Sequence, residues 1–299
     1  MAIIDSLGLA VHVRGLRQSA SGSNWSLIAN SGGQDILHAR MMVSPPFGTT
    51  YITVPRFGPE GFASVYAFGS FPFGSCGAGG TLELDTSPLS PSSVRLELRG
   101  DDLLCPLHIL LWGIADDGAV VPMTADLDVR FNLSDDEGEG FGSMPLTLVD
   151  SGDDATLFNE VVVFASLANN ANAAPTRQPV SLRVERANGD LVWASGLEDF
   201  HTLEQNGRTA KIWRLSDTEP FSRVDALGPV VPKLRVDGPD NAMIQAIVVF
   251  GINRDGPRPL AVPLVHHVPS LAESSPWVGT STPPEGRELS LPVCSTAAR

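Results

Sequence analysis

The sequence contains almost no lysine. Lys211 and Lys233 are the only two, and the other 18 basic residues are arginine. Acidic residues number 34 against 20 basic ones, so the formal net charge is −14. Binding to phosphate backbones or anionic lipid headgroups needs a dense positive surface. Direct contact with nucleic acid is therefore not expected.

A hydrophobic run long enough for a membrane helix is also lacking. The longest run, residues 103–115, spans 13 residues and contains Pro106 and His108, whereas a spanning helix needs about 20. The N-terminus carries Asp5 and no basic region ahead of its short apolar stretch. We therefore expect no membrane span and no secretory signal.

Cysteine and histidine are few and widely spaced. The three cysteines are Cys76, Cys105 and Cys294, which form neither a disulfide framework nor a CxxC metal site. The six histidines show no HxH or HExxH spacing. His108 lies in an apolar segment typical of a core, and adjacent His266 and His267 are expected to point to opposite faces of a strand. The sequence thus predicts no metal, no cofactor and no catalytic residue, and hence not an enzyme.

Other motifs fit loops better than sites. The glycine cluster at residues 69–80 lacks the phosphate-loop and nucleophile-elbow patterns. The acidic groups at 101–102, 135–139 and 153–154 lack the alternating spacing of a calcium loop. The tripeptide Arg99-Gly100-Asp101 is best explained as a turn between strands, with a receptor-recognition loop as the alternative.

Glycine and proline together supply 53 residues, and they separate short β-branched runs. This pattern predicts an all-β protein. The expected strands are residues 51–55, 93–98, 109–114, 126–131, 161–166, 180–185, 211–215, 233–236 and 244–252. One short helix is expected at residues 197–205.

An internal repeat is the most informative pattern. Residues 93–118 (SVRLELRGDDLLCPLHILLWGIADDG) align without a gap with residues 231–256 (VPKLRVDGPDNAMIQAIVVFGINRDG). Gly113 then meets Gly251, and Asp117-Gly118 meets Asp255-Gly256. A proline-containing apolar strand follows each copy. Two further pairings set residues 28–43 against 148–163 and, more weakly, 52–56 against 182–186.

The ordered repeats predict two tandem β-sandwich domains of jelly-roll-like architecture, related by internal duplication. The expected boundaries are 1–140 for the first domain and 141–269 for the second, with the acidic, glycine-rich stretch 134–143 as the linker. Residues 270–299 are rich in proline and small polar residues, which predicts an extended C-terminal tail on a surface.

The repeated element at residues 96–118 and 234–256, a strand followed by a turn, a long apolar strand and an acidic turn, resembles the last two strands of jelly-roll coat domains in picorna-like and related plant viruses. The resemblance covers about 25 residues per copy and lacks the basic arm of those proteins. It implies a structural virion protein, as a shell, surface or decorating subunit, located in the virion and made in the host cytoplasm.

The expected partners are the chain itself and other virion proteins, because edge strands and an extended tail favour assembly into a homo-oligomer. The candidate interface residues in the tail are Trp277, Val278, Leu289 and Leu291. The alternative function is a carbohydrate- or ligand-binding β-sandwich module, in which exposed aromatic side chains form the contact platform.

Overall fold

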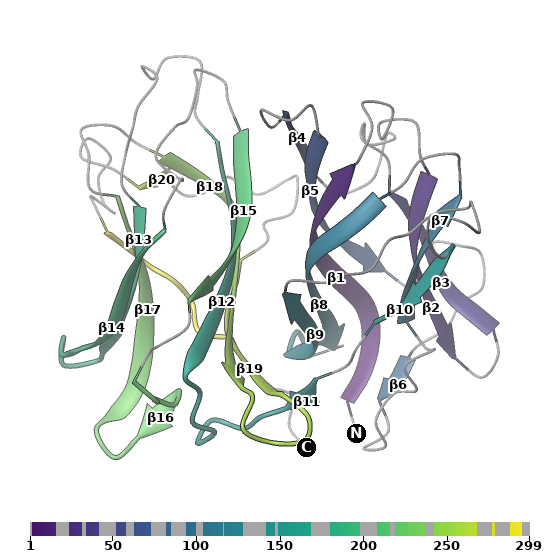
Figure 1. The fold of residues 1–299 in the computed structure, drawn as a ribbon. Coiled ribbons are helices and arrows are strands. Elements are labelled where there is room, and N and C mark those ends of the chain that lie inside the picture. The colour runs from purple at the N-terminus through teal and green to yellow at the C-terminus, as the bar shows by residue number, and fades with distance from the viewer. Residues whose placement is uncertain are drawn as a thin grey trace. The chain divides into compact units, whose positions relative to one another are not determined.

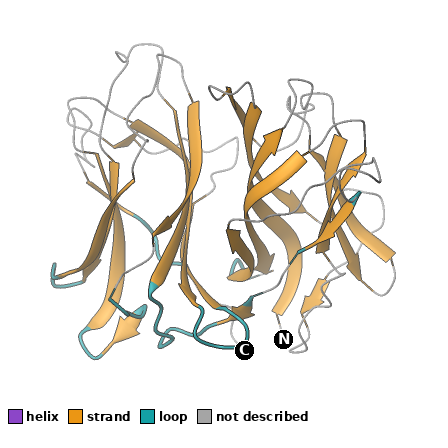
Figure 2. Cartoon of the chain, in the orientation of Figure 1, coloured by secondary structure: helices purple, strands orange, loops and turns teal. Residues whose placement is uncertain are grey.

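The computed structural model describes residues 2–15, 24–31, 34–41, 52–57, 63–72, 82–84, 94–99, 104–115, 117–127, 142–146, 149–168, 180–197, 208–215, 219–236, 242–267, 277–278 and 288–294. These residues form antiparallel strands, turns and connecting loops, with no helix among them (Figure 2). The all-β prediction is confirmed for this part of the chain. The chain divides into two compact units, with the division between Asp150 and Ser151.

The first unit contains two antiparallel sheets (Figure 1). Its strands are β1 (Ala2–Gly15), β2 (Asn24–Ser31), β3 (Gln34–Met41), β4 (Ile52–Phe57), β5 (Ala63–Pro72), β6 (Leu82–Leu84), β7 (Val94–Arg99), β8 (Leu104–Ala115), β9 (Val120–Leu127) and β10 (Ser143–Pro145). One sheet has the order β4-β5-β1-β8-β9, with β6 also paired to β1, and the other has the order β10-β7-β2-β3.

The second unit also contains two antiparallel sheets. Its strands are β11 (Asp150–Ser151), β12 (Glu160–Ala168), β13 (Val180–Arg186), β14 (Leu191–Leu197), β15 (Arg208–Leu215), β16 (Val224–Asp225), β17 (Gly228–Val236), β18 (Ala242–Asn253), β19 (Leu260–His267), β20 (Trp277–Val278) and β21 (Glu288–Ser290). The sheet orders are β11-β19-β18-β12-β15, with β20 also paired to β18, and β14-β13-β17-β16, with β21 also paired to β17.

Both sheets of the second unit contribute to one hydrophobic core. Val163 of β12 and Val249 of β18 come from one sheet, whereas Leu182 of β13 and Leu234 of β17 come from the other, and all four side chains are fully buried. Ile247 and Val249 are both in this core, so they share a face as strand alternation predicts.

Four strand pairs of the first unit have counterparts in the second. In the first, β1 pairs with β5 and β8, and β2 pairs with β3 and β7; in the second, β12 pairs with β15 and β18, and β13 with β14 and β17. The registers also agree, because Leu7 faces Gly113 as Val161 faces Gly251. A register shift follows Leu111 in the β8–β9 pair and Val249 in the β18–β19 pair. The aligned residues 93–118 and 231–256 each span two consecutive strands, β7 and β8 in the first unit and β17 and β18 in the second.

The other two proposed alignments are wrong. Residues 28–43 include β3, which pairs with β2, whereas residues 148–163 lead into β12, which lies between β15 and β18. Likewise β4, which contains residues 52–56, pairs only with β5 among the described strands, but β13, which contains residues 182–186, pairs on both sides. These pairings matched short apolar patterns rather than positions in the fold.

Two local predictions also need correction. The strand expected at residues 126–131 is Val120–Leu127 instead, and residues 128–131 lie outside the described part of the chain. Leu197, the expected first residue of a helix, is the last residue of β14, and residues 198–205 are not described.

Candidate functional site

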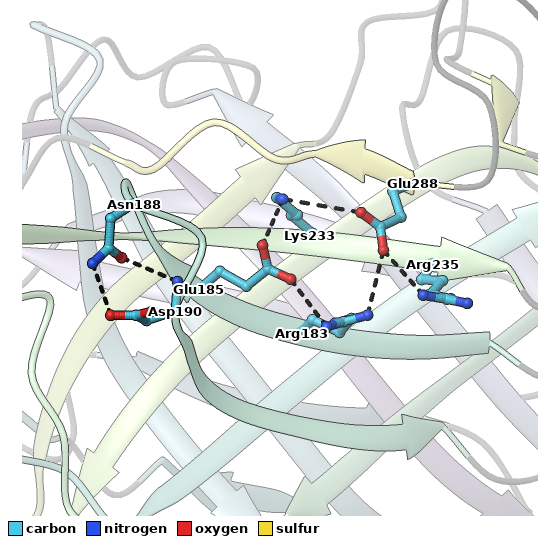
Figure 3. A network of polar contacts seen from close by, with 7 residues as sticks. All are labelled: Arg183, Glu185, Asn188, Asp190, Lys233, Arg235 and Glu288. Carbon is cyan, nitrogen blue, oxygen red and sulfur yellow. Dashed lines mark hydrogen bonds and ion pairs between the residues drawn. The ribbon is translucent and has the colours of Figure 1, made fainter.

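A network of charged side chains lies on one face of β13, β17 and β21 (Figure 3). Glu185 contacts Lys233 Nζ at 2.6 Å and Arg183 Nη2 at 3.2 Å. Glu288 of β21 contacts Arg183 at 3.4 Å, Arg235 at 3.3 Å and Lys233 at 3.9 Å. Three cations therefore surround two carboxylates, and Glu288 contacts all three.

Strand alternation creates this face. Leu182 and Val184 of β13, and Leu234 of β17, point into the core, which turns Arg183 and Lys233 to the other side. Arg183 lies directly opposite Lys233 in the β13–β17 pair. Two like charges so placed repel each other, and Glu185 and Glu288 offset that repulsion.

We call residues 288–294 the second closing segment, because they complete both sheets of the second unit. β21 pairs with β17 through Leu289 opposite Leu234, and the Leu291 amide donates to the Pro232 carbonyl at 2.8 Å. The Cys294 amide donates to the Leu264 carbonyl of β19 at 3.2 Å. The Leu291 side chain is only 3% exposed within the core.

Cys294 ends this segment in a half-buried position. Burial raises the pKa of its thiol to about 12, so the thiol stays protonated at neutral pH. A guanidinium nitrogen of Arg223 donates a hydrogen bond to the Cys294 carbonyl, and Arg223 also pairs with Asp154 at 3.0 Å. Cys294 is thus a protonated residue whose backbone is anchored by Arg223.

Residues 143–149 end the first unit in the same way, and we call them the first closing segment. Met144 of β10 lies opposite Leu96 of β7, and the Leu146 amide donates to the Val94 carbonyl at 3.1 Å. The Val149 amide donates to the Met123 carbonyl at 2.8 Å. Each of these contacts has its counterpart in the second closing segment, where Leu291 and Cys294 take the places of Leu146 and Val149.

The charge pattern distinguishes the two closing segments. Ser143 occupies the position opposite Glu97 that Glu288 occupies opposite Arg235. In the first unit the adjacent ion pair is Arg95 with Glu97, at 3.5 Å within the same strand. A carboxylate held by three cations belongs to the second unit alone among the described residues.

The predicted interface residues fall within the second unit. Trp277 and Val278 form β20, which pairs with Met243 and Ala242 of β18. Leu289 is partly buried against the core and Leu291 lies inside it. Contacts of these residues with another copy stay a prediction. Sequence reasoning missed the pairing of residues 143–146 and 288–291 with β7 and β17; a shared leucine, Leu146 and Leu291, was the available signal.

The described histidines lie on strands of both units. His108 is half-buried in β8, opposite His12 of β1. Burial and the neighbouring His267 lower the pKa of His266 to about 4, so His266 is neutral at pH 7. His201 lies outside the described residues. The described residues contain no group of three or more histidine, cysteine, aspartate or glutamate side chains placed to hold a metal ion.

The acidic pair at residues 153–154 stabilises a turn. The Asp153 carboxylate accepts hydrogen bonds from the Ala155 amide at 3.0 Å and the Thr156 hydroxyl at 3.0 Å. The other two acidic groups, at residues 101–102 and 135–139, lie outside the described residues. So does Gly100 of the Arg-Gly-Asp tripeptide. Of the glycine cluster at residues 69–80, the structure describes only Gly69–Pro72, which belong to β5.

Glu160 at the start of β12 is a buried carboxylate with two arginine partners. Arg214 of β15 donates to Glu160 Oε2 from Nε and Nη2, both at 2.8 Å, and Arg254 donates to Oε1 from Nη2 at 2.9 Å. Burying one carboxylate between two guanidinium groups ties the β12–β15 pair to the turn after β18.

Tryptophan side chains in the described part of the chain are largely inside the units. Trp112 is 1% exposed and Trp213 is 6% exposed. Trp193 of β14 is partly buried and stacks on Phe221, with ring centroids 6.5 Å apart. The side chains of Trp25 and Trp277 are not described.

Comparison with known proteins gives no relative: no protein-family model matches this chain, and no curated protein is similar to it. Among the described residues, no helix is long and apolar enough to span a membrane.

Proposed function

We propose that this chain is a structural virion protein, a capsid, capsid-surface or decorating subunit, that acts through self-assembly and contacts with other virion proteins. The observation that carries the proposal is strand addition. In each unit, the closing segment completes the sheets through backbone pairing and one buried leucine, Leu146 or Leu291. Strand addition is a common way for β proteins to join chains.

We further infer that the units are two jelly-roll-like β-sandwiches related by internal duplication. Support comes from the shared strand pairs, from the register shifts at equivalent positions, and from the matching closing segments. Agreement of these three features by chance in unrelated sandwiches is a poorer explanation than descent from one ancestral domain.

The exposed edge of β14 also supports assembly. β14 pairs only with β13 among the described strands, and its sequence LVWASGL contains neither a charged residue nor a proline. Other described edge strands carry such protective residues, for example Pro55 and Arg56 in β4 and Lys211 and Arg214 in β15. An unprotected edge favours pairing with another strand.

Electron microscopy and sedimentation of the full chain test this proposal. We expect closed oligomers or particles with regular symmetry, formed at increasing protein concentration. A protein that sediments as a monomer at every concentration, and that binds glycans on an array, would instead support the carbohydrate-binding module.

A further inference from the structure

The surface that receives the second closing segment is a built strand-binding slot. It offers the backbone edge of β17 at Lys233–Arg235, an apolar position that buries Leu291, and the Leu264 carbonyl of β19. Three cations from β13 and β17 lie where the first residue of the segment enters (Figure 3). The slot thus recognises an extended strand with a carboxylate at one end and a leucine three residues later.

The same slot in the first unit holds an unlike sequence. Residues 143–146 read SMPL and residues 288–291 read ELSL, yet both segments make the same backbone contacts and both bury a leucine, Leu146 at 1% and Leu291 at 3% exposure. Recognition therefore depends mainly on backbone pairing and one leucine, which are features that another copy of the chain supplies equally well.

We propose that the slot of the second unit accepts residues 288–294 from a second copy of this chain, so that exchange of closing segments links subunits. The inference rests on the proposed self-assembly and names the contact that performs it. Contacts made within a chain and between chains would be identical, so exchange costs little interaction free energy and is decided by the local concentration of neighbouring copies.

Chain connectivity disfavours this exchange for the first closing segment. Residues 143–149 run directly into β11, which pairs with β19. Twenty residues, 268–287, separate β19 from β21, and a chain of that length can span up to roughly 70 Å when extended. β20, within that stretch, is held by two residue pairs.

Glu288 gives the exchange its selectivity. The cations Arg183, Lys233 and Arg235 leave one positive charge in excess after pairing with Glu185 and Glu288, and two in excess without Glu288. A segment that begins with Ser143 leaves that excess uncompensated. The slot therefore favours residues 288–294 over residues 143–149 of a neighbouring copy.

Disulfide trapping in full-length chains tests the exchange. Lys233 and Ser290 lie directly opposite each other in the β17–β21 pair, a spacing that a disulfide can bridge. Chains carrying Lys233→Cys alone are mixed with chains carrying Ser290→Cys alone, assembled and oxidised. We expect disulfide-linked dimers on a non-reducing gel, with the bond between positions 233 and 290 identified by mass spectrometry of the peptides.

The first unit provides a matched control. Arg95 and Pro145 form the equivalent pair, so a mixture of Arg95→Cys chains and Pro145→Cys chains should give no such dimers, because the connection to β11 disfavours exchange of residues 143–149. A chain carrying both Lys233→Cys and Ser290→Cys should form the bond within the chain when it is dilute, which confirms that the pair can be bridged.

The exchange would be overturned if the mixed Lys233→Cys and Ser290→Cys chains gave no dimers while the double variant formed its bond within the chain. Regular particles seen in the same sample would leave the proposed function standing. Conversely, linked dimers without any larger oligomer would support exchange and contradict the virion role. A double variant that never forms the bond contradicts the pairing on which the inference rests.

Discussion

At the scale of single residues, two glycines explain why the long apolar strands pack closely. A Cβ at Gly251 would lie 2.5 Å from the ring of Phe158, and a Cβ at Gly113 would lie 2.7 Å from Ile4. Phe158 and Ile4 hold equivalent positions near the start of the first long strand of each unit. The repeated glycine is thus a packing requirement, since a larger residue would displace the side chain that covers it.

Gly251→Ala should therefore destabilise the second unit by about 1–3 kcal/mol through overpacking. The measurement is the denaturant midpoint of unfolding, followed by circular dichroism. Gly196→Ala is the matched control: a Cβ at exposed Gly196 meets no atom within 4 Å, and its effect should stay within about 0.5 kcal/mol. Equal effects of both substitutions would contradict the close approach at Gly251.

His266 makes the stability of the protein depend on pH. Its pKa is lowered from 6.5 to about 4 by burial, with a smaller contribution from His267. The unfolded chain then binds more protons than the folded chain between these values, so stability is fully present above pH 6.5 and is lost as the pH falls towards 4.

Between pH 6.5 and pH 5 the loss attributable to His266 should be about 2 kcal/mol. The free energy of unfolding measured against pH in the wild type and in His266→Gln should show it, with a flatter profile in the variant. His267→Gln should retain most of the slope, because burial is the larger cause. An unchanged slope in His266→Gln would show that His266 is not buried in its neutral form.

At the scale of elements, the closing segments contribute buried leucines to the cores of the two units. Leu291 and Leu146 are buried in the cores of their own units, although sequence reasoning placed Leu291 in an intermolecular interface. Leu291→Ala and Leu146→Ala should each cost about 2–4 kcal/mol, since truncating a buried leucine leaves a cavity. Chemical denaturation provides the measurement. Val293→Ala, at a side chain 39% exposed, should cost clearly less, and a comparable loss there would argue against specific docking of Leu291.

The uncharged edge of β14 makes a separate prediction. Ala194 is exposed and lies near the middle of that strand, so Ala194→Lys places a charge on the edge without entering the core. Lysine on an edge strand discourages pairing with another chain. We expect weaker oligomerisation by sedimentation velocity and an unchanged denaturation midpoint. Ser181→Lys, on the interior strand β13, is the comparison. If Ser181→Lys weakened oligomerisation as much as Ala194→Lys, the effect would not be specific to the edge of β14.

Sequence patterns predicted the strands that alternate or end at clear turns, and missed those that do not. Residues 180–185 and 244–252 were expected as strands and lie in β13 and β18. β1, the central strand of its sheet, was missed: Leu7, Leu9, Ala10 and Val11 are all fully buried, so both faces are apolar and the two-residue period disappears.

The charged site was hidden for a different reason. Glu288 is separated from Arg183 by more than 100 positions, and their contact depends on a strand pairing that no local pattern announces. The first repeat was visible because a glycine and a turn recur at one spacing. The closing segments escaped because their shared feature is a backbone register, with only one leucine in common.

At the scale of the whole molecule, charge is unevenly divided. Residues 1–150 contain seven basic and 17 acidic residues, a net charge of −10, whereas residues 151–299 contain 13 basic and 17 acidic residues, a net charge of −4. Copies of such a chain repel one another at neutral pH, and the first unit contributes most of that repulsion. Any assembly of copies must overcome this electrostatic repulsion. The repulsion is weaker for contacts made through the second unit, because that unit carries less net charge.

Assembly should therefore strengthen as salt is added. Raising NaCl from about 0.01 M to about 0.1 M shortens the Debye length from about 30 Å to about 10 Å, which screens repulsion between whole subunits. The contacts of Glu288 are at 3.3–3.9 Å with half-buried partners, so they are screened much less over this range. Light scattering across the salt series should show larger oligomers at higher salt, while the denaturation midpoint shows that the units stay folded. Dissociation with rising salt would mean that exposed ion pairs, and not strand exchange and apolar contacts, hold the assembly together.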